Sequence, residues 1–89
     1  MDTPVAMFTV YVLYSVKYDK IYIGFTSDFA QRLKSHNELG VKGWTIKFRP
    51  WILIYTEEYL LKSEAIKREK ELKTAAGRRF LREKVKNRS

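Results

Sequence analysis

Apolar and aromatic residues gather in three runs along the chain, and each run predicts a strand. Residues 8–16 are β-branched or aromatic almost throughout, which is typical of a strand covered on both faces. A polar turn at residues 17–20 leads to a second short strand at residues 21–23, which Gly24 follows. Because this connection is so short, the two strands are expected to pair as an antiparallel hairpin. The third run, residues 51–56, is again nearly continuous in apolar character.

Helical periodicity appears between and after these runs. The spacing of apolar residues predicts helices over residues 28–37, 64–75 and 78–86. Residues 26–28 offer N-cap oxygens to the first helix, and Ser63 offers one to the second. Gly77 is expected to end the second helix at its C′ position, or to act as a hinge before the third. The order β-β-α-β-α-α predicts an α+β fold in which helices flank a three-stranded antiparallel sheet.

The 89 residues are expected to form one domain over residues 6–85, with a frayed basic tail at residues 86–89. The chain has no cysteine and one histidine, which excludes disulfides, thiolate zinc sites and multi-histidine metal sites within one chain. No apolar run reaches the roughly 18 residues of a membrane helix, and the N-terminus does not resemble a signal peptide. A cytoplasmic protein without a membrane partner is therefore the expectation.

The positive charge of the chain is concentrated in its last third. The formal net charge is +8; residues 1–60 carry seven basic and six acidic side chains, whereas residues 61–89 carry eleven and four. Such a region suits a phosphate backbone, although a solvated basic helix face has the same composition. The residues expected to contact nucleic acid are Lys67, Arg68, Lys70, Lys73, Arg78, Arg79 and Arg82.

Glu69 departs from the pattern of its predicted helix. It shares an inward stripe with Ala65, Ile66 and Leu72, whereas the other charged side chains of this segment fall on polar faces. An inward carboxylate is unfavourable unless it is paired or bound to a metal. The pattern alone leaves two interpretations open, a functional acid or an edge residue in a salt bridge to Arg32 or to a lysine.

Two further pairs of polar residues are candidates for chemistry. Arg32 and His36 are four residues apart, so both project from one face of the predicted helix. Arginine suits a phosphate because its planar guanidinium donates two parallel hydrogen bonds, and histidine exchanges a proton near neutral pH. Tyr11 and Tyr22 lie on the paired strands, where their hydroxyls can approach each other. Each of these four residue types is also common in a purely structural role. Only their combination indicates a functional site.

The order and spacing of these residues resemble those of the GIY-YIG nuclease family. The two name-giving motifs correspond to Val10–Leu13, preceded by Thr9 in place of a glycine, and to Tyr22–Thr26. The later motifs correspond to Arg32–Asn37, to Gly43, Thr45 and residues 50–55, and to Ala65, Glu69, Leu72 and Lys73. The resemblance covers roughly residues 8–81. It is to a small stand-alone domain, similar to the N-terminal nuclease domain of the excinuclease C subunit.

The resemblance implies divalent-metal-dependent hydrolysis of a phosphodiester bond in DNA. Glu69 is then the protein ligand of one Mg²⁺ or Mn²⁺ ion, and Arg32 holds the scissile phosphate. Tyr11 or Tyr22 orients or deprotonates the attacking water, and His36 assists proton transfer.

The resemblance also implies a structural role for Gly24, which lets the backbone approach closely beside the second tyrosine. The implied partner is DNA, in repair or recombination, with RNA as an alternative and with a homodimer or a protein partner to direct the nuclease. A competing hypothesis is a non-catalytic nucleic-acid-binding module on the same fold. The change Glu69→Gln separates the two, because it abolishes cleavage by an enzyme and leaves a binding module unaffected.

Overall fold

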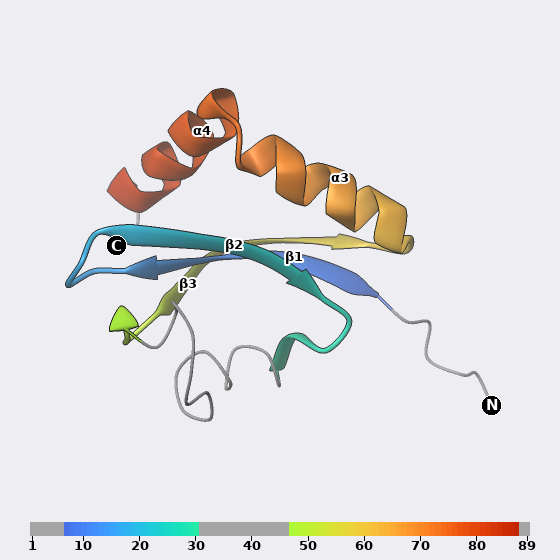
Figure 1. Ribbon diagram of the computed structural model, residues 1–89, viewed down its shortest axis with the longest axis horizontal. Helices are drawn as coiled ribbons and strands as arrows, with labels where there is room; N and C mark the ends of the chain where they lie inside the picture. The colour runs from blue at the N-terminus through green and yellow to red at the C-terminus, as the bar shows by residue number, and fades with distance from the viewer. Residues whose placement is uncertain (1–6, 31–46, 88–89) are drawn as a thin grey trace.

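An antiparallel sheet with two helices across one face forms the centre of the fold (Figure 1). The computed structural model describes residues 7–30 and 47–87. Its strands are β1 (Phe8–Ser15), β2 (Lys20–Thr26) and β3 (Ile52–Tyr59), in the order β2-β1-β3, and both neighbours run antiparallel to β1. The expected α+β fold with a three-stranded antiparallel sheet is confirmed.

The central position of β1 explains its continuous apolar run. Every residue from Val10 to Ser15 is buried, because neighbouring strands pair with both edges and side chains cover both faces. Val10 and Val12 face the two helices, and Tyr11 and Leu13 face the opposite side, as the alternation of a strand requires. The predicted two-sided burial of this strand is therefore confirmed.

The flanking strands are longer than their apolar runs indicate. Pairing with β1 carries β2 from Lys20 through Thr26, and it carries β3 through the polar residues Glu57 and Glu58 to Tyr59. Both strands lie at the edges of the sheet among the described residues, and edge positions accept polar side chains. A search for apolar runs therefore places their ends too early.

Two helices, α3 (Lys62–Leu72) and α4 (Ala75–Lys86), lie across the same face of the sheet and are inclined to each other (Figure 1). The core between them and the sheet consists of Val10, Val12, Ile23, Ala65, Leu72 and Leu81. None of the described helices is long and apolar enough to cross a membrane.

The boundary between the two helices differs from the prediction. Thr74 is the N-cap of α4, and its hydroxyl accepts a hydrogen bond from the Gly77 backbone nitrogen at 3.2 Å. Gly77 thus lies in the first turn of α4, and its predicted role as a C′ stop or hinge is wrong. Ser63 is not the cap of α3 either, because the N-cap position is Leu61 and carries no side-chain cap bond.

The first predicted helix lies mostly outside the described residues. Phe29 and Ala30 are helical, and the preceding Asp28 backbone nitrogen donates to the Thr26 hydroxyl at 3.0 Å. This bond lies within the segment that the sequence predicts as the helix cap. Short polar side chains are common there because they accept hydrogen bonds from backbone nitrogens.

A polar network joins the edge strand β3 to α3. The Glu57 carboxylate accepts hydrogen bonds from the hydroxyls of Tyr55 and Tyr59. It also accepts one from Arg68 Nε, which lies 3.0 Å from Oε1, the closer carboxylate oxygen. Burial opposes the charge of Glu57, but these three donors outweigh it and hold the pKa of the carboxyl below its usual value. The hydrogen bond to Glu57, together with burial, raises the pKa of Tyr59 to about 12.

We expect Glu57→Gln to reduce the free energy of unfolding at neutral pH by about 1–2 kcal/mol, since charge-assisted hydrogen bonds are lost. The folded pKa of Glu57 is lowered, so its stabilising effect is present above the unfolded pKa of about 4.3 and is lost as pH falls through the folded value. Urea unfolding of both proteins from pH 7 to pH 3 should show a difference that narrows below about pH 4. The exposed neighbour Glu58→Gln is the control; an equal loss in both variants would contradict the network.

Candidate active site

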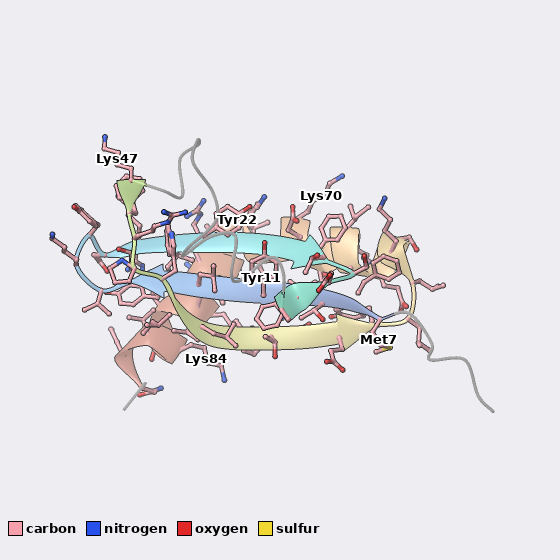
Figure 2. The ribbon with its side chains drawn as sticks, turned by 90° about the horizontal axis from the view of Figure 1, so that it is seen from below. Met7, Tyr11, Tyr22, Lys47, Lys70 and Lys84 are labelled. Carbon is pink, nitrogen blue, oxygen red and sulfur yellow. The ribbon has the colours of Figure 1, made fainter. Side chains whose placement is uncertain are left out.

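Two tyrosines lie side by side on the sheet face that points away from α3 and α4. Tyr11 comes from β1 and Tyr22 from β2, and their ring centroids are 6.1 Å apart. Viewed from that side, both side chains come from adjacent strands (Figure 2). Tyr11 is 1% exposed, whereas Tyr22 is only partly buried. The hairpin therefore brings the two phenols together and leaves Tyr22 as the one more accessible to solvent.

Two further aromatic residues hold these rings in place. The Tyr11 ring lies 5.5 Å from the Phe29 ring, and the Tyr22 ring lies 6.2 Å from the Trp51 ring, centroid to centroid. Trp51 is buried and packs with Tyr11 and Leu13 in a second core cluster. Aromatic pairs at such separations stabilise defined ring orientations. Sequence reasoning treated Phe29 and Trp51 only as apolar positions, because nothing in the spacing showed that they would contact the tyrosines.

Gly24 makes this arrangement sterically feasible. It pairs with Tyr11 across the hairpin, and a Cβ atom at this position would lie 2.7 Å from the Tyr11 hydroxyl oxygen and 3.0 Å from Tyr22 Cε1. Real Cβ atoms are almost never found so close to other atoms, so any side chain here would displace the phenols. The groups that lie close to the backbone at Gly24 are therefore the side chains of both tyrosines, Tyr11 and Tyr22.

We expect Gly24→Ala to lower the free energy of unfolding by about 1–3 kcal/mol, because the added methyl group overpacks a buried site. The cost should be smaller in a Tyr11→Phe background, where the oxygen nearest to the new methyl group is absent. Chemical unfolding of the four proteins of this double-mutant cycle measures the coupling. Equal costs of Gly24→Ala in both backgrounds would show that the hydroxyl does not limit the space.

Glu69 lies on α3 with its side chain 18% exposed, so it is largely but not fully buried. Its Oε1 atom accepts a hydrogen bond from Lys73 Nζ at 3.0 Å, one helical turn away. The side chain is therefore mostly shielded from solvent and also forms a salt bridge to a lysine. Such a salt bridge is one of the two interpretations that the sequence leaves open. The lysine of this pair is half exposed, and a salt bridge of that kind contributes little to stability.

A hollow along the outer edge of β2 extends from Tyr22 to the C-cap of α3 and to α4. We call it the β2-edge groove; it has a volume of about 410 Å³ and is lined by Asp19, Lys20, Ile21, Tyr22, Ile23, Lys73, Arg78 and Arg82. Tyr22 and Lys73 lie in the same lining, and Lys73 is bonded to Glu69. The edge of the sheet thus brings the more accessible tyrosine near the helix that carries the candidate acid.

The basic residues predicted to contact nucleic acid are distributed over several surfaces. Lys73, Arg78 and Arg82 line the β2-edge groove, whereas Arg68 is bonded to Glu57 on β3. Figure 2 shows Lys70 beyond the β2 edge and Lys84 beyond the β3 edge of the sheet. Lys67 and Arg79 are exposed on their helices, outside the groove lining.

Arg32 and His36, the other two predicted catalytic residues, lie outside the described residues. Within residues 7–30 and 47–87, no three acidic or histidine side chains gather at one point. Among these described residues, Glu69 would be the ligand offered to a metal, with water and substrate oxygens beside it. This arrangement fits Mg²⁺ or Mn²⁺, because these hard cations bind carboxylate oxygens and Mg²⁺ retains several water ligands. The partial exposure of Glu69 leaves access for such a shell.

The family model of the GIY-YIG catalytic domain matches residues 7–83, which include β1, β2, β3, α3 and most of α4. The chain therefore belongs to the GIY-YIG family, a family of nuclease type. This membership confirms the resemblance seen in the sequence motifs.

Among curated proteins, the chain is similar to a UPF0213 protein of Staphylococcus aureus (strain Mu3 / ATCC 700698). The two are 40% identical over 62 residues, which cover 70% of this chain and 76% of the relative. A UPF0213 protein of Staphylococcus haemolyticus (strain JCSC1435) is 37% identical over 65 residues, covering 73% and 78%. The names of these relatives state no activity.

Proposed function

We propose that the protein is a divalent-metal-dependent endonuclease that hydrolyses phosphodiester bonds in DNA. The observation that carries the proposal is the placement of Tyr22 and of Lys73, the partner of Glu69, in one groove of a GIY-YIG domain. A function in DNA repair or recombination and a cytoplasmic location are part of the same proposal.

The exposure of the two tyrosines supports different roles for them. Tyr22 is the more accessible of the two and belongs to the groove lining, so we assign to its hydroxyl the role of orienting the attacking water or accepting its proton. Tyr11 is buried against Phe29 and Gly24, so it positions the Tyr22 ring and does not contact the substrate. This division follows from accessibility, because a proton acceptor must lie within hydrogen-bond reach of the water.

The remaining roles follow from residue chemistry and family membership. Glu69 would hold the metal, and the metal would supply stabilisation of the charge that develops on the phosphate and the leaving oxygen. Lys73 bonds Oε1 of Glu69, so the second carboxylate oxygen would remain for the ion. Arg32 binds the scissile phosphate, and His36 transfers a proton to or from the reacting oxygens.

The proposal is tested by incubating the protein with labelled single-stranded, duplex, flapped and branched DNA and with RNA of matched sequence. Each substrate is incubated with Mg²⁺, with Mn²⁺ and with EDTA. We expect cutting of at least one DNA substrate that requires the metal and is faster than cutting of the matched RNA. Failure to cut any DNA while DNA is bound would overturn the nuclease assignment.

A second candidate function is a binding module without turnover. It is favoured by the salt bridge between Glu69 and Lys73, which gives the acid an ordinary partner on its own helix. In that case Glu69→Gln leaves nucleic-acid binding unchanged, and substitution of the basic residues removes this binding, which is the only activity of such a module.

A further inference from the structure

The β2-edge groove collects four cationic side chains from three parts of the chain. Lys20 begins β2, Lys73 is the C-cap of α3, and Arg78 and Arg82 lie on α4. One carboxylate, that of Asp19, is the acidic member of the lining. The groove is therefore a basic surface that the fold assembles from residues far apart in sequence.

Two of these cations are held by acids beside them. Arg82 Nη1 donates to Asp19 Oδ1 at 2.6 Å, and the same oxygen accepts a hydrogen bond from the Tyr14 hydroxyl at 2.7 Å. Lys73 is held by Glu69 at 3.0 Å. These bonds engage the acid of the groove, so Asp19 repels an incoming anion less than an isolated carboxylate would.

The other two cations are available to a ligand. Among the described residues, neither Lys20 nor Arg78 takes part in an ion pair. Lys20 rests over the Phe48 ring at 5.7 Å, and Arg78 Nε donates to the Lys73 backbone oxygen at 3.3 Å. Both side chains are thus oriented by neutral partners, and Lys20 acts on Asp19 only through space, as one of the charges that lower the pKa of that carboxyl.

The groove is elongated along β2. It follows β2 from Lys20 at the turn to Ile23, a length of about 10 Å at the usual rise of a strand. Tyr22 lies within this length. Successive phosphates on one strand of B-form DNA are about 3.4 Å apart along the helix axis, so the groove is long enough for more than one of them.

We propose that the β2-edge groove binds the sugar–phosphate backbone of one DNA strand next to the scissile phosphate, with Lys20 and Arg78 as its main phosphate contacts. This inference rests on the proposed nuclease function, since Tyr22 marks where cleavage occurs. A polyanion fits better than a small anion, because the cations are spread along the groove from the turn to α3. Contacts of this kind position a strand without reading its bases.

The test compares two lysines of the same turn that differ in whether they line the groove. Lys20→Glu changes the lining, whereas Lys17→Glu makes the same charge change at an exposed residue outside it. Binding of a fluorescent single-stranded oligonucleotide is measured in EDTA, where metal-dependent cleavage is absent, at several salt concentrations. Melting temperatures of all variants establish that each is folded.

We expect Lys20→Glu to weaken binding about tenfold and to reduce the slope of log K against log salt by about one. Lys17→Glu should weaken binding less than about threefold, through net charge alone. Arg78→Gln, on the opposite wall, is the second variant and should behave like Lys20→Glu, so the result does not depend on one protein being stable. Equal weakening by Lys17→Glu and Lys20→Glu, with unchanged slopes, would overturn the inference.

This result is separable from that of the nuclease assay. If the groove variants lose binding but no substrate is cut in the presence of metal, the nuclease proposal fails and the groove is a DNA-binding surface. If substrate is cut and Lys20→Glu binds and cuts it as the unmodified protein does, the groove inference alone fails.

Discussion

Glu69→Gln is expected to reduce metal-dependent cleavage by at least about 10³-fold, which corresponds to about 4 kcal/mol of transition-state stabilisation. The amide keeps the size of the side chain but removes the charge that holds a divalent cation. DNA binding in EDTA should persist within about threefold, because the groove cations remain and the loss of an acid reduces repulsion. Single-turnover cleavage and oligonucleotide binding, measured on the same preparations, check both parts.

Glu71→Gln is the matched control. Glu71 lies two residues further along α3, is exposed, and is outside the β2-edge groove. Its substitution should leave the cleavage rate unchanged within about twofold, since exposed charges have weak effects at a distance. Equal losses in the two variants would mean that the net charge of α3, and not a site at Glu69, determines cleavage.

Gly77→Ala is expected to lower the free energy of unfolding by about 2–3 kcal/mol, or the melting temperature by about 10 °C or more. A Cβ atom on Gly77 would lie 2.4 Å from the Glu71 backbone oxygen and 2.5 Å from Leu72 Cα. These are backbone atoms of α3, so the contact cannot be relieved by rotating a side chain. Thermal and urea unfolding measure the change.

Helix propensity alone predicts the opposite sign, because alanine is more favourable than glycine in a helix by about 1 kcal/mol. Ala76→Gly, at the neighbouring exposed position, is the control and should cost no more than about 1 kcal/mol. A more stable Gly77→Ala protein would show that the two helices do not pack as closely as described here.

The strands were predictable from the sequence where burial leaves a local pattern. β1 is covered on both faces, so its residues form one apolar run that can be recognised without the structure. Gly77 was misread because a glycine that ends a helix and a glycine in the first turn of the next helix, packed against the end of the first, look the same in a sequence. The difference depends on how α3 and α4 pack, which is a tertiary property.

The arrangement of the candidate residues was predictable to the extent that it is local. The hairpin placed Tyr11 beside Tyr22, and the helical stripe turned Glu69 inward. The β2-edge groove was not predictable, because it joins Lys20 to arginines of α4 that follow nearly sixty residues later. The seven basic residues selected from composition therefore did not include Lys20, and they did not separate the residues of the groove from Arg68, which is bonded to Glu57.

Conversion of supercoiled plasmid to the nicked form is the measurement that tests the central claim most directly. The purified protein is incubated with plasmid in Mn²⁺ or Mg²⁺, in EDTA, and in EDTA followed by an excess of Mg²⁺. We expect nicking with either metal, none in EDTA, and recovery when Mg²⁺ is restored. Intact plasmid in every lane, with plasmid binding demonstrated in the same buffers, would contradict it.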